Sequence, residues 1–403
     1  MKKVNSATTP TIVPVQQNER IHILDILRGF AVFGILAVNI GGFASPSLLP
    51  GYHPPDPMPW YDALGESVMR FLAEGKFYTI FAFLFGLGFS VQLSRAEGKG
   101  ANIRSFYPRR LWVLFGFGIL HALLFWMGDI LRLYALLGFA LLAFRKRSNR
   151  TILTWAIIFF IMSFFVLGLI GGPAGGNDPI PGLDVAGMAR QAYTSKSFLS
   201  VVVFQAMMLL PDFIIIVLAQ GLSVMALFLL GLLAGRSQLF ERLEENRHLL
   251  KRTLLIGLAI GLAGNSVMLL ARDPWLASLG FTIGAPALSA AYVSALALLS
   301  LRAGWLSALG NVGRMALSNY VLQSIVCSFL FNGYGLGLYD QVGMAGLWGI
   351  VFAIFAIQIP LSNWWLERFQ FGPLEWIWRS LTYRNLQPMR RPLSRILMTL
   401  EQP

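Results

Sequence analysis

The chain has 403 residues, of which 56% are hydrophobic and only 13% charged, and its formal net charge is +13. Soluble globular proteins carry about a quarter charged residues. A chain this poor in charge cannot cover a water-facing exterior, so the composition excludes an ordinary soluble domain and predicts a membrane protein. The basic residues fall in short clusters between apolar runs. This pattern is typical of loops that face lipid headgroups and argues against nucleic-acid binding.

Apolar segments recur along the whole chain. A helix needs roughly 20 mostly apolar residues to cross a bilayer, and no segment shows the sustained alternation of a membrane β-strand. We therefore predict an all-α fold, a polytopic transmembrane helix bundle of about ten spans. The predicted spans are residues 22–44, 77–93, 109–127, 129–144, 151–171, 212–235, 252–271, 278–301, 314–333 and 343–366.

The segments between the spans predict the organisation of the chain. The first span is too long for a signal peptide and is interrupted by charges, so we expect it to remain uncleaved. The loop 45–75 is expected to be ordered and partly re-entrant or interfacial, and the Gly- and Pro-rich loop 172–196 to be a flexible cover. The expected parts are a disordered cytoplasmic tail over 1–19, an N-terminal membrane half over 20–235 with about six spans, a C-terminal half over 236–383 with about four spans and an interfacial helix at 374–382, and a cytoplasmic tail over 384–403.

Lysine and arginine predict the orientation. If the N-terminus is cytoplasmic, 25 of the 32 basic residues fall at inside positions and six fall outside. The remaining one, Arg28, lies within the first span. Cytoplasmic loops of membrane proteins are enriched in these residues. We therefore expect both termini in the cytoplasm.

Cysteine and histidine patterns indicate little redox or metal chemistry. The single cysteine, Cys327, lies in an apolar run and cannot form a disulfide within the chain. The sequence contains no Cys-x-x-Cys motif and no His-rich tract, so we expect no metal cofactor.

Ionisable residues at membrane depth are candidates for a functional site because burying a charge in hydrocarbon is costly. Asp25 and Arg28 share a helix face at the start of the first span. They form either a helix-end ion pair or part of a cytoplasm-facing anion site. Asn39 lies about 16 Å further along that helix and is either a binding contact or an interhelical hydrogen-bonding group.

His121 is the most distinctive single residue. It lies eleven residues past Arg110, past mid-membrane, where an imidazole has no route to the headgroups. It is either a neutral histidine bonded between helices or a general base. Asp129, in the following turn, either caps the next span or orients His121.

The ninth span carries polar side chains at spacings of four residues, which stack along neighbouring helix faces. So polar a helix must face other helices or a hydrated cavity, so these groups are interhelical hydrogen-bonding groups or a cavity wall. They are Arg314, Ser318, Asn319, Tyr320, Gln323 and Ser324.

These motifs together resemble the YeiB-like family of bacterial inner-membrane proteins, over nearly the whole chain after residue 20. The resemblance implies residence in the bacterial cytoplasmic membrane. The residues that carry it are Leu24 to Gly29 with Asn39, Gly75 to Gly86, His121 with Phe125 and Trp126, Gly128 to Leu131, Gly313 to Tyr320 with Gln323, and Phe371 to Trp376 with Trp378 and Arg379.

The Asp-x-x-Arg-Gly opening of the first span is similar, more remotely, to transmembrane acyltransferases such as heparan-α-glucosaminide N-acetyltransferase. Those enzymes move an acyl group from cytoplasmic acyl-CoA to a sugar across the membrane. In the lysosomal enzyme the essential histidine follows the first span. His53 occupies that region here, whereas the YeiB-like pattern places its histidine at His121, which is a departure from the acyltransferases.

The resemblance implies an acyltransferase that binds acyl-CoA, with His121 as base and Asp129 as its orienter. The implied partners are the lipid bilayer and a small-molecule or glycan acceptor, without nucleic acid. A transporter of a small polar solute is the alternative, although no internal repeat supports it. A third hypothesis is a non-catalytic membrane component. The predicted acyl-CoA-binding residues are Arg28, Asn39, Arg109, Arg110, Arg314, Asn319, Tyr320 and Gln323.

Overall fold

All regular structure in the described part of the chain is helical, as predicted, apart from an isolated bridge between Phe369 and Arg390. The predicted tail over 1–19, the last residues of the predicted C-terminal tail and part of the loop 172–196 lie outside the described residues. The computed structural model describes residues 21–54, 57–98, 100, 102–173 and 181–391.

Fourteen α-helices follow one another within those residues, and a short 3-10 turn, Leu142–Phe144, extends the fifth. They are α1 (His22–Ala44), α2 (Trp60–Leu72), α3 (Lys76–Gly98), α4 (Tyr107–Leu124), α5 (Leu131–Leu141), α6 (Asn149–Leu169), α7 (Val185–Thr194), α8 (Phe198–Arg236), α9 (Arg247–Leu270), α10 (Pro274–Ser300), α11 (Ser307–Arg314), α12 (Ala316–Phe331), α13 (Met344–Arg368) and α14 (Pro373–Tyr383).

Each of the ten predicted spans overlaps a helix. Seven stretches of the described chain are long and apolar enough to cross a membrane: α1, the run through α2 and α3, α6, α8, α9, α10 and α13. The other three predicted spans are α4, whose first turn carries two arginines, and the shorter apolar helices α5 and α12. The prediction of a polytopic helical bundle is confirmed.

Two helices differ from their predicted bounds. The span predicted at 212–235 is the second part of α8, whose 39 residues run through Pro211 without a break. The span predicted at 314–333 is divided at Met315, so Arg314 ends α11 and Ser318 belongs to α12. The expected stacking of Arg314 on Ser318 within one helix is therefore wrong. The physical reason is that α12 begins afresh, with a carboxylate from α14 bonded to its first free N–H groups.

Helix α1 packs against α3, α11, α12 and α13. Glycines bring it close to α11: a Cβ on Gly29 would strike the Leu309 carbonyl, and one on Gly313 would strike the Asp25 carbonyl. Small residues at such contacts let two backbones approach and pack tightly in lipid. This approach positions the start of α1 beside Arg314.

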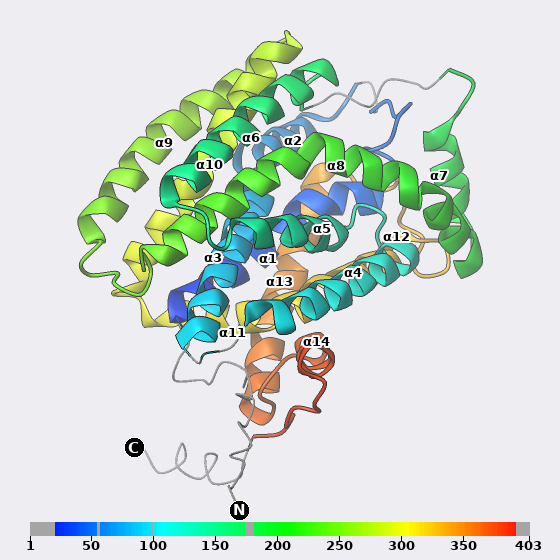
Figure 1. Ribbon diagram of the computed structural model, residues 1–403. Coiled ribbons are helices and arrows are strands. Elements are labelled where there is room, and N and C mark those ends of the chain that lie inside the picture. Colours follow the sequence, from blue (N-terminus) through cyan, green and yellow to red (C-terminus); the bar gives the residue numbers. More distant parts are fainter. Residues whose placement is uncertain (1–20, 55–56, 99, 101, 174–180, 392–403) are drawn as a thin grey trace, which may run out of the picture.

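The basic loops gather at one end of the bundle. We call this the basic end and define it by His22 on α1, Arg95 on α3, Arg110 on α4 and helix α14. Figure 1 shows α14 and the last turns of α13 projecting there, while α9 and α10 form one flank. Arg236, at the end of α8, joins the same end by donating to carbonyls in the turn after α5. The starts of α1 and α4 and the ends of α3 and α8 thus lie at the same end of the bundle.

Candidate functional site

Three side chains form a continuous hydrogen-bonded line inside the bundle. The Nδ1 atom of His121 lies 2.8 Å from Asp129 Oδ2, and its Nε2 atom lies 2.8 Å from Ser324 Oγ. At most 2% of each residue is exposed. An ionised carboxylate only accepts, so we assign the ring proton to Nδ1, which leaves Nε2 to accept from the serine hydroxyl.

A chain reversal after α4 brings Asp129 back to His121. The backbone N–H groups of Phe125 and Trp126 both donate to the His121 carbonyl at 2.9 Å, which ends the helix. Gly118 leaves room for the returning carboxylate, because a Cβ there would lie 2.7 Å from Asp129 Oδ1. That oxygen accepts from the Arg132 backbone N–H at 3.0 Å. Asp129 therefore makes the capping bond at α5 and the histidine contact at the same time.

Arg132 extends this cluster toward α8. Its side chain is 1% exposed and lies 2.9 Å from Asp212 Oδ2, and its Nε is 3.6 Å from Asp129 Oδ1. It also donates to the carbonyls of Met127 and Leu209 at 2.8 and 2.9 Å. A buried guanidinium is stable only when its charge is paired. Two carboxylates and two carbonyls surround this one, while its Nε atom has no hydrogen-bond partner among the described residues. Arg132 is one of the six basic residues that the charge count places outside, but the structure shows it as an internal charge between two carboxylates.

A cavity of about 310 Å³ begins at the basic end and extends between α1, α3, α4 and α12. Apolar side chains such as Leu84, Phe85 and Leu114 line its walls. Two carboxylates, Asp25 and Glu375, face it together with five basic residues, so the basic residues outnumber the acidic ones by three. The five are Arg28, Arg95, Arg110, Arg314 and Arg379.

Two of these arginines are held by their neighbours. Arg28 donates to Asp25 Oδ1 at 2.7 Å. The Arg110 guanidinium stacks over the Trp378 ring at 3.6 Å, and Trp378 Nε1 donates to the Arg110 carbonyl at 2.8 Å. Stacking leaves the edge donors of a guanidinium available. The entry is therefore a preformed basic surface.

Glu375 closes one wall of this cavity. Its carboxylate accepts from the Leu317 N–H at 2.7 Å and from the Ser318 N–H at 3.1 Å, and it also bonds the Ser318 hydroxyl. The Leu374 N–H donates back to Ser318 Oγ at 3.0 Å. Burial raises the pKa of the Glu375 carboxyl, and the Ser318 and Leu317 bonds oppose that rise. These bonds fix α14 on the first turn of α12.

Tyr320 connects the cavity to His121. It lines the inner part of the cavity, and its ring centroid lies 4.8 Å from that of His121. The residue is 7% exposed, and its phenol oxygen finds no hydrogen-bond partner among the described residues. Buried phenols are normally bonded. Tyr320 is therefore a candidate donor to a ligand at the inner end of the cavity.

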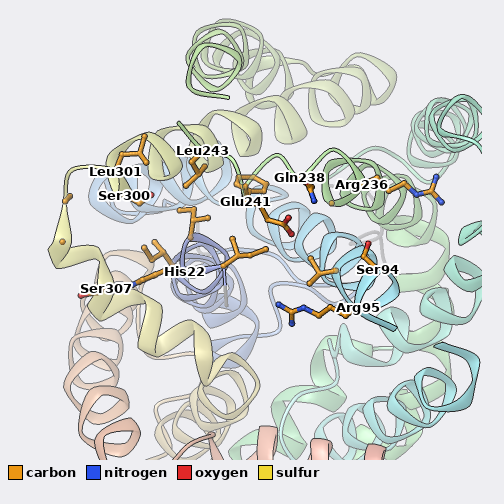
Figure 2. A pocket seen from close by; sticks show the side chains of 18 residues that line it. His22, Ser94, Arg95, Arg236, Gln238, Glu241, Leu243, Ser300, Leu301 and Ser307 are labelled. Carbon is orange, nitrogen blue, oxygen red and sulfur yellow. The ribbon is translucent and has the colours of Figure 1, made fainter. Parts of the chain in front are cut away.

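A wider hollow of about 1050 Å³ adjoins the cavity at the basic end. Figure 2 shows Arg95 and Glu241 projecting toward it, while Arg236 turns away. Ile21, Val91 and Arg95 line both spaces. The hollow and the cavity therefore adjoin at these three residues.

The predicted site residues divide between the cavity and the surrounding packing. Arg28, Arg110, Arg314 and Tyr320 line the cavity, whereas Asn39, half-buried in α1, does not. The binding role predicted for Asn39 stays a prediction.

The remaining candidates contact other helices or the chain beside them. Asn319 donates to the Val312 carbonyl and Ser362 Oγ at 3.1 and 3.0 Å, and Gln323 donates to Gln358 Oε1 at 2.8 Å. These bonds join α12 to α11 and α13. Arg109 donates to the Ser105 carbonyl at 3.0 Å. Their predicted roles in binding remain untested.

Two polar residues of this region have partners that the sequence does not predict. Ser324 belongs to the predicted polar stripe of the ninth span, but its partner His121 is 203 residues distant in the chain. Asp212 is the first residue of the predicted span 212–235, and a carboxylate beside an apolar run is itself a signal in the sequence. Its partner, Arg132, becomes recognisable only when α5 and α8 are seen together.

The described residues contain no group of three or more His, Cys, Asp or Glu side chains placed to hold a metal ion. Cys327, three residues past Ser324, is fully buried in an apolar cluster with Phe331. The site as described consists of hydroxyl, imidazole, carboxylate and guanidinium groups.

The fold and site define a polytopic α-helical membrane protein in which a basic cavity leads toward a buried hydroxyl–imidazole–carboxylate line. The family described as "Protein of unknown function (DUF418)" matches residues 234–385, which cover α9 to α14.

Three relatives match almost the whole chain. It is 36% identical to "Uncharacterized protein YxaH" of Bacillus subtilis (strain 168), over 94% of this chain and 98% of that protein. It is 32% identical to an "Uncharacterized 39.9 kDa protein in amylase 3'region" of Bacillus acidopullulyticus, over 93% and 97%. It is 30% identical to "Uncharacterized protein YeiB" of Escherichia coli (strain K12), over 94% and 100%. The chain belongs to the YeiB-like family, as its motifs indicate.

Proposed function

We propose that this protein is a transmembrane acyltransferase of the bacterial inner membrane. It takes an acyl group from a cytoplasmic acyl thioester such as acyl-CoA and passes it to a hydroxyl or amine acceptor on the other side. The observation that carries this proposal is the cavity, which begins among five arginines and reaches Tyr320, whose ring packs on His121.

The chemistry of the cavity suits an anion with a long uncharged arm. Arginine binds phosphate oxygens through paired, charge-assisted hydrogen bonds. Arg28, Arg95 and Arg110 therefore suit the phosphates of acyl-CoA at the basic end. The apolar walls beyond them suit a pantetheine-like arm, which places the thioester near Tyr320. The excess of basic residues on this side favours a cytoplasmic position for the entry.

His121 is suited to act as the general base. Its Nδ1 proton is held by Asp129, and Nε2 faces a hydroxyl at 2.8 Å. A neutral imidazole in this tautomer takes a proton from an acceptor group. The Tyr320 hydroxyl, at the inner end of the cavity, is suited to donate to the thioester carbonyl, where a hydrogen bond stabilises developing negative charge.

A solute transporter is the second candidate, and the chain Asp129–Arg132–Asp212 favours it. Buried carboxylates and arginines within membrane helices are typical of proton-coupled pathways. Accumulation of a solute in vesicles driven by a proton gradient, without acyl transfer, would support this candidate instead.

Binding of acyl-CoA to the purified protein tests the proposal. Isothermal titration in lipid nanodiscs measures the Kd of the wild type, of Arg110→Ala and of Arg104→Ala. Arg104 is an exposed cation near the same end that does not line the cavity, so it is the matched control. Loss of a charged hydrogen bond costs about 1.5–3 kcal/mol, so we expect Arg110→Ala to weaken binding by roughly ten- to a hundredfold.

Two outcomes contradict the proposal. One is the absence of acyl-CoA binding by the wild type. The other is an equal loss in both arginine variants, which indicates only a general charge effect. Thermal unfolding of each variant shows that the fold is retained, because Arg110 also stacks on Trp378.

A further inference from the structure

The hydrogen-bonded line of Ser324, His121 and Asp129 has the arrangement of a catalytic triad, in which a hydroxyl, an imidazole and a carboxylate follow one another. The serine hydroxyl faces Nε2 and the carboxylate faces Nδ1, each at 2.8 Å. In such a triad the carboxylate fixes the imidazole tautomer, and the imidazole accepts the hydroxyl proton as the oxygen attacks.

The Ser324 hydroxyl lies closer to the His121 ring than to the backbone carbonyl of its own helix. A serine inside a helix commonly donates to the carbonyl four residues earlier. For Ser324 that carbonyl, on Tyr320, lies at 3.3 Å, against 2.8 Å to the imidazole. Ser328, one turn further along α12, does not share this contact: its hydroxyl donates to the Phe125 carbonyl, just past the end of α4, at 3.1 Å.

The triad lies one helical turn beyond the cavity. Tyr320 and Ser324 are four residues apart on α12 and share a face, at a rise of about 6 Å. Tyr320 lines the cavity with its hydroxyl unpartnered, and its ring covers His121. Ser324 itself does not line the cavity, so a carbonyl carbon reaches it only after side chains such as Tyr320 move.

We infer that Ser324 is a catalytic nucleophile that carries the acyl group as an ester during transfer. This inference rests on the proposed function. The Ser324 Oγ–carbonyl bond forms, the carbon–sulfur bond of the thioester breaks, and His121 Nε2 takes the hydroxyl proton and returns it to the departing thiolate. The acceptor hydroxyl or amine then gives a proton to His121 and bonds the carbonyl carbon. The ester bond breaks, and Ser324 regains its proton.

The triad supplies what a serine needs for this step. A free hydroxyl is a weak nucleophile and is activated by an adjacent base. The three side chains are fully buried, which excludes the water that would hydrolyse the ester before the acceptor arrives.

Trapping the acyl group on the protein tests the inference. Purified protein in nanodiscs is incubated with acyl-CoA carrying a radiolabelled acyl group, without acceptor, and intact-mass spectrometry follows the same reaction. We expect one acyl group per chain, attached at Ser324 in peptide analysis. Ser324→Ala and His121→Ala abolish the label, and the matched control Ser328→Ala retains it.

The Ser324→Cys variant separates a nucleophile from a merely positioning hydroxyl. It replaces the oxygen by sulfur at the same place, so a covalent mechanism converts the adduct from an oxygen ester to a thioester. We expect the wild-type label to resist hydroxylamine at neutral pH and the cysteine label to be released by it. Thermal unfolding confirms that both Ser324 variants fold.

The outcomes distinguish this inference from the proposed function. Transfer of the acyl group to an acceptor without a protein-bound adduct, or an adduct that persists in Ser324→Ala, overturns the inference and leaves the acyltransferase intact. Absence of both acyl-CoA binding and transfer overturns both. An adduct with the expected hydroxylamine behaviour supports both.

Discussion

At the scale of single residues, the carboxylate of Asp129 performs two tasks. One oxygen accepts from the Arg132 backbone N–H and the other holds His121 Nδ1. The absence of a side chain at Gly118 is what lets the carboxylate lie against α4. The orientation of the His121 ring therefore depends on the turn between α4 and α5, on Gly118 and on the Asp129 carboxylate.

Replacing Asp129 by asparagine tests this dependence. An amide NH₂ facing Nδ1 favours the other tautomer, which turns Nε2 into a donor and removes the base. We expect acyl transfer to fall on the order of 10²–10⁴-fold, with acyl-CoA affinity within about twofold, because Asp129 does not line the cavity. Steady-state transfer assays and titration measure the two quantities. Equal activity in Asp129→Asn would show that the tautomer is irrelevant.

At the scale of helices, α14 acts as the cap of α12. The helix that crosses near the site begins at Ala316 because Glu375 bonds its first free N–H groups. A carboxylate at a helix N-terminus is favourable both as an acceptor and through the helix dipole. Docking of α14 therefore positions Tyr320 one turn further on.

This docking is expected to depend on pH. Burial raises the pKa of Glu375 above its ordinary value of 4.5, so the folded state favours the protonated carboxyl. The protonated carboxyl therefore contributes its full share of stability below pH 4.5, and this share is lost as the pH rises through the raised pKa. We expect amide hydrogen exchange in α14, corrected for its intrinsic rate, to accelerate as the pH increases through that pKa.

Glu375→Gln is the control for that titration, because the amide keeps an acceptor oxygen and cannot ionise. Exchange in α14 of this variant should stay constant over the same pH range. An unchanged pH dependence in Glu375→Gln would assign the effect to another group.

At the scale of the whole molecule, the charge pattern and the packing agree on the direction of four helices. One end of each of α1, α3, α8 and α10 surrounds the hollow at the basic end. The count of lysine and arginine residues places these same four ends on one side of the membrane. The absolute orientation remains a prediction of the positive-inside rule.

Labelling in intact cells tests the orientation. Cys327 is fully buried, so single cysteines placed at exposed positions report their own side. We expect a membrane-impermeant maleimide to label Lys196→Cys, between α7 and α8, in whole cells. Ser105→Cys, before α4, should react only after lysis. The reverse pattern would invert the topology and place the arginine-lined entry outside.

The fold class and its spans follow from the sequence because they depend on local properties. The length of an apolar stretch determines whether it can cross a bilayer, and the charge of each loop favours one side of it. Arg28 and His121 are recognisable for the same reason, since an ionisable residue in an apolar run is costly wherever the helix packs. The capping alternative for Asp129 is likewise visible within its turn.

Which of these groups meet depends on how helices far apart in the chain pack together. Ser324 joins His121, Asp212 joins Arg132 and Glu375 caps α12 through contacts between distant helices. Asn319 and Gln323 face other helices, while Tyr320 beside them faces the cavity. Lipid tails are as apolar as the side chains of a membrane helix, so the hydrophobic effect does not decide which face of a helix turns inward. The rotation of each helix about its axis is set by small-residue contacts and buried hydrogen bonds. Those contacts depend on pairs of helices, and no single stretch of sequence contains them.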